Sequence, residues 1–388
     1  MFDTAFRTPY RPFFISTFLT AIGSWMHNVA AAITVYQLTG SAFVTGMVSA
    51  AQFGMILLLA PVAGRVADSV DKRLIIVVWQ AVTAVAAGLL AVLVALDLQS
   101  PLAIILIALA MGCTDGIAKP ASQAILPELV GPRRVDEAIA LNSVCYNVGR
   151  ALGPGLGGAL VVAAASWLPF ALNAALSAVA FWLVVRAHGP EWESRSGSVS
   201  AGGMALLRTR GIRVVLLSGV AVALAADPAL TLAPQMAAEA DQSSGFAGII
   251  GSSFGIGSLL AFAGMSKVRK SLGLTSMGSI GLALIGIGVA TAGLTAGDHV
   301  LVLASIGLGG AGFMTAAVAL ASLAQQRANP SELGRVMAAW GAAFLGMRPI
   351  ASLLNGAIAD AAGLVVACVV AAVPALVMST RLGRPSGS

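Results

Sequence analysis

Charged residues are scarce in this chain. Lys, Arg, Asp and Glu together make up 10% of its 388 residues, whereas soluble domains carry roughly 25%. Hydrophobic residues account for 58%, and the mean hydropathy is +0.92. This balance excludes a soluble enzyme and predicts a protein that lies almost entirely within a lipid bilayer.

Residues suited to metal, redox or nucleotide chemistry are equally few. The chain has three histidines and three cysteines, and Cys113, Cys145 and Cys368 fall in apolar segments without the spacing of metal ligands or of a disulfide framework. The sequence contains no Gly-x4-Gly-Lys-Ser/Thr phosphate loop, which excludes direct ATP hydrolysis. We expect no catalytic residue, metal, cofactor or nucleic-acid partner, and we attribute the pI of about 9.7 to membrane insertion.

Long apolar runs dominate the rest of the sequence. Their lengths suit helices that span a bilayer, which need ~20 apolar residues, and none alternates with the two-residue period of a barrel strand. We therefore predict an all-α polytopic membrane protein with twelve transmembrane helices, over residues 13-36, 43-66, 74-96, 102-127, 137-163, 167-185, 212-235, 244-266, 272-296, 299-325, 334-358 and 364-380.

The placement of charge predicts the orientation of these helices. If the N-terminus is cytoplasmic and the helices alternate, every Lys and Arg outside a helix core falls on the cytoplasmic side, from Arg7 to Arg384. The opposite side carries acids alone, namely Asp97, Glu239, Asp241, Asp298 and, at a helix end, Asp360. This is the positive-inside pattern. We expect both termini in the cytoplasm, the protein in the cell inner (plasma) membrane, and an N-terminal segment that is retained because it has no cleavage site.

One polar segment divides the chain. Residues 187-211 are rich in Gly and Ser, and we predict that they form a cytoplasmic linker between an N-terminal six-helix half, 1-186, and a C-terminal six-helix half, 212-388. An offset of 195 residues places Pro154 on Pro349, which suggests a duplication. Two pseudo-symmetric halves suit a transporter whose binding site lies at the bilayer midplane between them.

The loop between the second and third predicted helices carries a family resemblance. Its sequence GRVADSVDKR, from Gly64 to Arg73, resembles the signature G-x-x-x-D-R-x-G-R/K-R/K of the major facilitator superfamily. Ser69 and Asp71 depart from the usual Arg and Gly. The resemblance implies the major facilitator fold.

This loop is also a candidate conformational latch formed by Gly64, Asp68, Lys72 and Arg73. Asp68 could dock on the start of the eleventh helix, near residues 331-335, where the first backbone N–H groups of the helix lack partners. Lys72 and Arg73 either contribute to this latch or only anchor the membrane topology.

The fifth predicted helix contains GRALGPGLGG, which resembles the G-x-x-x-G-P-x-x-G-G element of antiporters in the same superfamily, although Ala140 replaces an earlier Gly. The resemblance favours export. The motif predicts close approach to a neighbouring helix and a bend at the proline, so we interpret it as helix packing, with a direct substrate role as the alternative. Its small residues and proline are Gly149, Gly153, Pro154, Gly157 and Gly158.

Three further phrases resemble the transmembrane secretion effector branch of that superfamily. They are GSWMHNVA at 23-30, QLTGSAFVTG at 37-46 and KPASQAILPELV at 119-130. That branch includes exporters of siderophores, macrolides and other drugs, so the resemblance implies transport of a small amphiphilic organic compound.

Six ionisable residues fall inside predicted helices. A charge at a helix centre in the bilayer costs ~2.5 to 3.5 kcal/mol, so such groups need a partner, water or a function. We consider all six as candidates for proton coupling or for the substrate cavity: Asp227, Asp115, Lys119, Arg150, Arg348 and His27.

For the carboxylates, two interpretations are open. Asp115 and Lys119 are spaced i, i+4 and could neutralise each other, or Asp115 could take up a proton or a cationic group. Asp227 has no opposite charge in its own helix, which favours proton coupling unless Arg150, Arg348 or Lys119 reaches it across the cavity.

For the other groups the alternatives also stay open. Arg150 and Arg348 could bind an anionic substrate bidentately or tie helices to backbone carbonyls. His27 could titrate near neutral pH or remain neutral and hydrogen-bonded. Ala108 occupies the position where many antiporters of the superfamily carry an Arg in helix 4, so coupling through that Arg is absent.

The sequence thus predicts a secondary active transporter. The expected function is proton-coupled efflux of a small amphiphilic compound by alternating access, with the proton as coupling ion, the lipid bilayer as environment and a monomeric state. One alternative is an importer or lipid flippase on the same fold, for which Arg150 and Arg348 would suit an anionic substrate. The other is a non-transporting membrane sensor.

Overall fold

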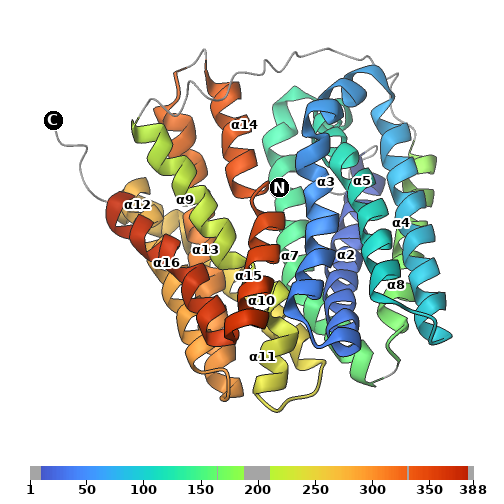
Figure 1. Ribbon diagram of the computed structural model, residues 1–388. Coiled ribbons are helices and arrows are strands. Elements are labelled where there is room, and N and C mark those ends of the chain that lie inside the picture. Colours follow the sequence, from blue (N-terminus) through green and yellow to red (C-terminus); the bar gives the residue numbers. More distant parts are fainter. Residues whose placement is uncertain (1–9, 164, 188–209, 330–331, 383–388) are drawn as a thin grey trace.

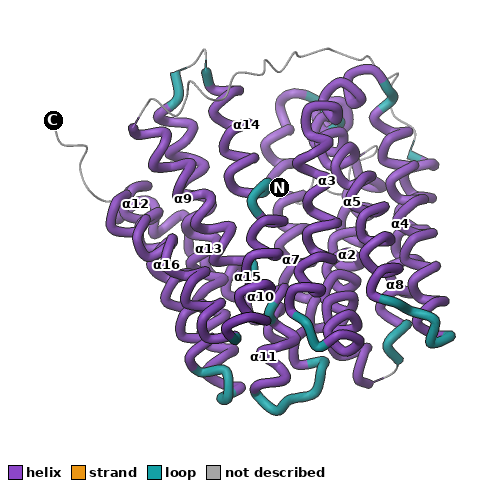
Figure 2. Tube along the Cα trace, viewed as in Figure 1, coloured by secondary structure: helices purple, strands orange, loops and turns teal. Residues whose placement is uncertain are grey.

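The computed structural model describes residues 10–163, 165–187, 210–329 and 332–382. Within these ranges, side-chain details at 60, 61, 64, 65, 67, 68, 132, 210, 266–270, 334 and 338 are not described. The described secondary structure is helical throughout, and the helices run side by side as a bundle (Figure 1, Figure 2). The predicted linker at 187-211 lies, apart from its two ends, outside the described residues.

Six long helices make up the first half of the bundle. Their ends coincide with polar caps, as at Ser41, Asp71 and Ser100, whose side chains accept hydrogen bonds from the first backbone N–H groups of the next helix. The elements are α2 (Tyr10–Thr39), α3 (Ala42–Ser69), α4 (Lys72–Ala95), α5 (Pro101–Ala124), the short α6 (Leu126–Val130) and the 3-10 turn Pro132–Arg134, α7 (Val135–Ala163) and α8 (Leu168–Arg186).

The second half is more broken. The span predicted at 212-235 consists of α9 (Arg210–Ala226), α10 (Pro228–Thr231) and α11 (Ala233–Glu239). The spans predicted at 244-266 and 272-296 form one element, α12 (Phe246–Leu294), which changes direction at Gly273, where φ is +71°. The remaining elements are α13 (His299–Arg327), then α14 (Leu333–Phe344) and α15 (Arg348–Ala362), which share the eleventh span, and α16 (Leu364–Leu382).

These helices confirm the predicted fold class. Within the described residues, 11 helical segments are long and apolar enough to cross a membrane. The twelfth span is α7, which is less apolar because it contains Asp136, Glu137 and Arg150.

The surface of the bundle also fits a bilayer. Large aliphatic side chains point outward from many helices, for example Val85 at 71%, Leu102 at 65% and Leu260 at 70% exposure. A soluble protein rarely exposes apolar patches on this scale, whereas lipid tails are as apolar as these side chains. The protein is therefore a multi-pass membrane protein.

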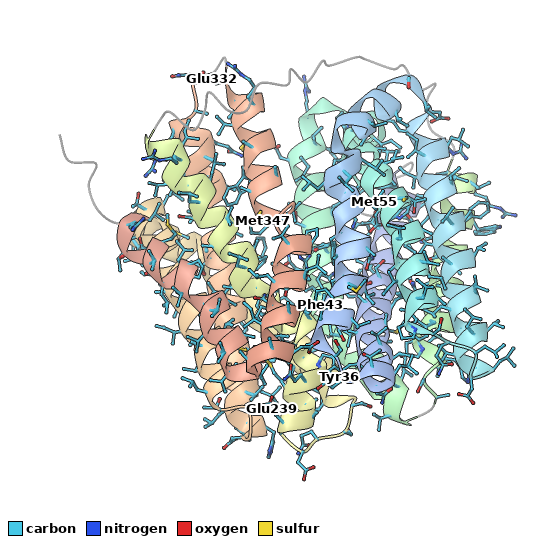
Figure 3. The ribbon with its side chains drawn as sticks, in the orientation of Figure 1. Tyr36, Phe43, Met55, Glu239, Glu332 and Met347 are labelled. Carbon is cyan, nitrogen blue, oxygen red and sulfur yellow. The ribbon has the colours of Figure 1, made fainter. Side chains whose placement is uncertain are left out.

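The two ends of the bundle differ in charge. The basic end is defined by helix termini that carry Lys72, Arg73, Arg186, Arg327 and Arg335, and the acidic end by Asp97, Glu239, Asp241, Asp298 and Asp360. In Figure 3, Glu332 at the start of α14 lies at the first of these ends, and Glu239 lies near Tyr36 at the other.

Contacts between the halves concentrate toward the acidic end. There α7 packs along α12, and α3 packs along α15. By contrast α14, which occupies the basic-end part of the same span as α15, packs mainly on α9 and α13 of its own half. Figure 1 shows α14 standing apart from α3 and α7. The structure is therefore a conformer in which the halves are joined at the acidic end.

Candidate functional site

Asp227 lies at the break between α9 and α10, with 2% of its surface exposed. Its carboxylate accepts hydrogen bonds from Thr231 Oγ1 at 2.9 Å, from Asn355 Nδ2 at 3.0 Å and from the hydroxyl of Ser352. Ser352 and Asn355 belong to α15, so the carboxylate links the seventh and eleventh spans. No Lys or Arg that the structure describes forms an ion pair with Asp227.

Each of the two linked spans is interrupted close to a proline. Pro228 follows Asp227 and starts α10, and Pro349 follows Arg348 at the start of α15. Because proline lacks a backbone N–H and clashes with the preceding turn, it starts a new helix more readily than it continues one. The breaks leave Asp227 and Arg348 at helix junctions inside the bundle.

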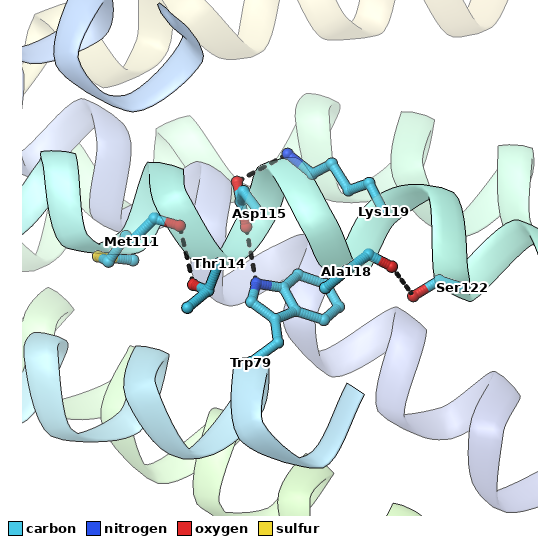
Figure 4. Close-up of polar contacts among 7 residues, drawn as sticks. All are labelled: Trp79, Met111, Thr114, Asp115, Ala118, Lys119 and Ser122. Carbon is cyan, nitrogen blue, oxygen red and sulfur yellow. Dashed lines mark hydrogen bonds and ion pairs between the residues drawn. The ribbon is translucent and has the colours of Figure 1, made fainter. Parts of the chain in front are cut away.

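Asp115 and Lys119 form the ion pair that their i, i+4 spacing allows. Lys119 Nζ lies 2.7 Å from Asp115 Oδ2, and the indole N–H of Trp79 donates to Asp115 Oδ1 at 2.7 Å (Figure 4). The Lys119 side chain is 44% exposed, whereas that of Asp115 is only 11% exposed. Asp115 is thus neutralised and oriented within the first half.

Arg150 and Arg348 line one small cavity at the contact between the halves. The cavity has a volume of about 20 Å³ and is also lined by Trp25, Phe254 and Leu230. Arg150 comes from α7 in the first half and Arg348 from α15 in the second. The cavity therefore brings together two of the predicted site residues that lie far apart in the sequence.

His27 lines a separate cavity of about 10 Å³, to which α3 and α5 also contribute side chains. It is 3% exposed, its ring packs edge-on against Phe170 at 5.0 Å between centroids, and its Nδ1 atom has no hydrogen-bond partner among the described residues. Leu230 lines this cavity and the arginine cavity alike. The structure thus places His27 near the central site but in contact with neither Asp227 nor the arginines.

One face of the glycine-rich motif in α7 packs on α2 of the same half. A methyl group on Gly153 would lie 2.6 Å from Cβ of Trp25, and one on Gly157 would lie 2.6 Å from the backbone oxygen of Met26. Gly149 meets Ala21 in the same way, at 2.7 Å from its carbonyl carbon. These glycines recur every four residues, so they form a single stripe that lets α7 and α2 touch through their backbones.

The other face of the motif crosses to the second half. Pro154 packs against Gly251 of α12, with 2.8 Å between the proline Cβ and a methyl group built on that glycine. A methyl group on Gly158 would lie 2.9 Å from Cα of Gly248, and Ser252 accepts a hydrogen bond from Gly155 N at 2.7 Å. The motif therefore joins the two halves near the acidic end.

The basic residues of the loop signature contact their own half. Lys72 Nζ pairs with Glu128 at 2.9 Å, and the Arg73 guanidinium donates to the backbone oxygens of Val184, at 3.0 Å, and Val185 at the end of α8. The surroundings of Gly64 and the side chain of Asp68 are not described, so the docking of Asp68 on the eleventh span stays a prediction.

A capping contact at the opposite end joins the halves. The Asp360 carboxylate, near the end of α15, accepts hydrogen bonds from Ser41 Oγ at 2.5 Å, Ala42 N at 2.8 Å and Phe43 N at 3.1 Å. These groups form the N-terminus of α3, where orphan N–H groups and the helix dipole favour an anion. Asp360 thus caps a helix of the other half and holds the acidic end together.

Several of these contacts are not evident from sequence reasoning. Ser352 and Asn355 follow Arg348 at i+4 and i+7, so a polar stripe on one face of an apolar span was the available signal. Trp79 and the capping role of Asp360 depend on tertiary contacts and have no such local signal.

Comparison with known proteins defines the family. The transmembrane secretion effector family matches residues 4–384, which is almost the whole chain. The chain belongs to this family of major facilitator superfamily transporters. Its members are transporters and not enzymes, which agrees with the sequence prediction.

Two relatives and one solved structure agree with this family. The staphyloferrin A transporter of Staphylococcus aureus is 29% identical over 150 residues, or 38% of each chain. The MFS-type transporter YfiS of Bacillus subtilis, which is uncharacterised, is 26% identical over 179 residues, covering 43% of this chain and 40% of YfiS. The aligned regions span less than half of either relative. A variant of the nucleoside transporter NupG superposes with a TM-score of 0.80 at 13% identity, covering 96% of this chain and 98% of NupG, so the fold is shared.

Proposed function

We propose that the protein exports a small amphiphilic organic compound across the plasma membrane by alternating access, in exchange for protons, and that Asp227 carries the coupled proton. The observation that supports the proposal is the environment of Asp227: a carboxylate at the core of a transporter, 2% exposed and surrounded by neutral hydrogen-bonding groups. Ionisable groups at this depth are costly and mark ion pathways by default.

The hydrogen bonds around Asp227 can serve both of its protonation states. A serine hydroxyl has one hydrogen and two acceptor lone pairs, and Ser352 Oγ contacts both Asp227 and the backbone oxygen of Arg348, the latter at 3.0 Å. When Asp227 is ionised, Ser352 donates to it. When Asp227 is protonated, its O–H donates to Ser352, whose hydrogen turns to the Arg348 oxygen. A rotation of one hydroxyl therefore accompanies uptake or release of the proton.

The remaining groups of this site do not change between the two states. The amide of Asn355 has two hydrogens, which reach Asp227 at 3.0 Å and the backbone oxygen of Leu224 at 3.2 Å. Thr231 donates to the carboxylate as well. Asp115 is a weaker candidate because Lys119 and Trp79 already contact both of its carboxylate oxygens.

The direction and orientation in this proposal rest on other features. The positive-inside rule assigns the basic end and both termini to the cytoplasm, so the present conformer would be closed to the outside. The antiporter-like motif of α7 joins the halves at that closed end. We propose in addition that Asp68 latches the opposite, cytoplasmic end in the alternate conformer, and that the monomer is the working unit.

Flux in inverted membrane vesicles tests the proposal. A panel of cationic drugs, macrolides and siderophores is offered under an inside-acidic gradient, and accumulation that collapses with the gradient is the expected result. Asp227→Asn should abolish gradient-driven accumulation while substrate exchange without a gradient persists, because only proton exchange is lost. Ser352→Ala should slow the gradient-driven mode.

A buried serine elsewhere in the same half supplies the matched control. Ser258 is fully buried but contacts only the backbone oxygens of Phe254 and Gly310. Ser258→Ala should therefore leave proton coupling unchanged. Gradient-driven accumulation that survives in Asp227→Asn with the parent pH dependence would refute the role of Asp227, and accumulation of no compound in the parent protein would count against an exporter.

A further inference from the structure

The two arginines of the central cavity form no ion pair with any acid that the structure describes. Arg150 is 8% exposed, and neither guanidinium donates a hydrogen bond to a described residue. Asp115 is already paired with Lys119. Asp227 interacts electrostatically with Arg348 but not as an ion pair, and its hydrogen bonds come from neutral groups. Each guanidinium carries five N–H donors and no acceptor.

Each guanidinium group lies against an aromatic ring of the other half. The guanidinium carbon of Arg150 lies 4.2 Å from the ring centroid of Phe313 and 4.5 Å from that of Phe254, both in the second half. The guanidinium carbon of Arg348 lies 4.2 Å from the centroid of Phe53, in the first half. Ring faces attract a cation, but they offer no oxygen for its N–H groups. Each arginine thus reaches across to the other half and keeps its hydrogen-bonding capacity.

Two positive charges at this depth need an anion. Charged side chains within a bilayer either pair or belong to a substrate pathway, and a planar guanidinium binds a carboxylate or phosphate through two parallel hydrogen bonds. We propose, building on the transport function proposed above, that the substrate is an organic anion whose acidic group binds between Arg150 and Arg348. A ligand held in this way contacts both halves at once, which is the requirement for coupling its binding to their movement.

The surroundings indicate the shape of such a ligand. The cavity of about 20 Å³ accommodates a small polar group and not a whole molecule in this conformer. Beyond Arg150, the ring of Phe313 packs against that of Phe344, with 5.6 Å between the ring centroids. Phe344 in turn stacks on Trp340, with 5.3 Å between centroids and 12° between the ring planes. This row extends from the arginines along α13 and α14. The body of the ligand is therefore expected to be apolar or aromatic, with the acid at one end.

Equilibrium binding of two dyes to the purified full-length chain in nanodiscs tests the proposal. Fluorescein is an anion and rhodamine 6G a cation, and both are built on a xanthene ring system, with additional ethyl and methyl groups on rhodamine 6G. Fluorescence polarisation should show tighter binding of fluorescein. Arg150→Gln and Arg348→Gln should each weaken it about tenfold or more, since a hydrogen-bonded charge is lost. The Lys variants should lose less, because the charge remains while the two-pronged geometry is lost.

Arg186 supplies the matched control. It also lies over an aromatic ring, that of Trp182 at 4.0 Å, but at the end of α8 and away from the cavity. Arg186→Gln should bind fluorescein as the parent does. If a Gln variant fails to fold, the Lys variant at the same position tests the proposal instead. A Lys variant that binds fluorescein as tightly as the parent protein overturns the proposal.

Other outcomes separate this inference from the function proposed above. Preference for rhodamine 6G, or full fluorescein affinity in both Gln variants, would overturn the anion site even if proton-coupled export is observed. Binding needs no gradient, so loss of proton coupling would leave the expected dye selectivity intact. A phosphonate-bearing dye run beside fluorescein distinguishes a carboxylate from a phosphate preference.

Discussion

Removing the Asp360 carboxylate is expected to loosen the acidic end of the transporter. The perturbation is Asp360→Ala, which deletes the hydrogen bonds to Ser41, Ala42 and Phe43 of the other half. Ser41 remains the N-cap of α3, and we take the loss of the additional Asp360 contacts to cost about as much as loss of an N-cap, about 1 kcal/mol. Loss of a charge near a helix N-terminus costs about 0.3 to 1 kcal/mol more when the site is exposed. The sum of about 1 to 2 kcal/mol shifts the ratio of the two conformers by roughly 5- to 30-fold toward the form open at this end.

Two companion variants separate the causes. Asp360→Asn keeps a capping oxygen but loses the charge, so its shift should be smaller than that of Asp360→Ala. Asp298 is the matched control, because it caps α13 at the same end through Val300 N at 2.9 Å and Leu301 N at 3.0 Å, within its own half. Asp298→Ala should lower stability without changing the conformer ratio.

Electron–electron distance measurements report the ratio directly. Spin labels on Leu98→Cys and Leu294→Cys, which are 64% and 66% exposed on loops and helix ends of different halves, would follow the acidic end once the three native cysteines are replaced by alanine. A longer-distance population should grow in Asp360→Ala. If its distance distribution matches that of the parent, or if Asp298→Ala shifts the distribution equally, the capping argument is wrong.

Two further sets of variants test the packing and the ion pair described above. Gly158→Val should separate α7 from α12, because even a methyl group would lie 2.9 Å from Gly248 Cα. The same distance measurement should then show a more open acidic end. Gly341→Ala is the control and should leave the distances unchanged, because no atom lies within 4 Å of a Cβ built on Gly341. Asp115→Asn and Lys119→Met should each lower the unfolding temperature in detergent, and the double variant should lose less than their sum, with a coupling of about 0.5 kcal/mol; strict additivity would mean that the pair contributes nothing.

Most of the fold can be predicted from the sequence, because membrane insertion imposes simple patterns of hydrophobicity and charge. Apolar runs longer than a bilayer is thick identify the spans, and confinement of Lys and Arg to alternate loops fixes their number. The Asp115–Lys119 pair is local to one helix and so follows from spacing alone. The small residues of the Gly149 to Gly158 motif predict close helix packing, but the use of opposite faces for α2 and α12 depends on how three helices meet.

Features that depend on distant segments escape the same reasoning. The sequence indicates only that Asp360 is an acid at a helix end, since nothing near it in sequence reveals that the start of α3 lies beside it. The division of the seventh span was not predicted, although Asp227 and Pro228 are adjacent, because proline is tolerated within transmembrane helices. The polar stripe of Arg348, Ser352 and Asn355 is visible in the sequence, but its role in binding Asp227 depends on the packing of α15 against the seventh span.

The breaks at Asp227 and Arg348 also have a mechanical consequence. The seventh span is interrupted between α9 and α10, and the eleventh span between α14 and α15. A helix bends most easily where proline has removed a backbone hydrogen bond. Asp227 lies at the first of these breaks, and Arg348 is the first residue after the second, each immediately before a proline. Protonation of Asp227 or binding of an anion to Arg348 would therefore act on each span where it bends most easily. Such a change could alter the angle between two helix segments directly, without a chain of intermediate contacts.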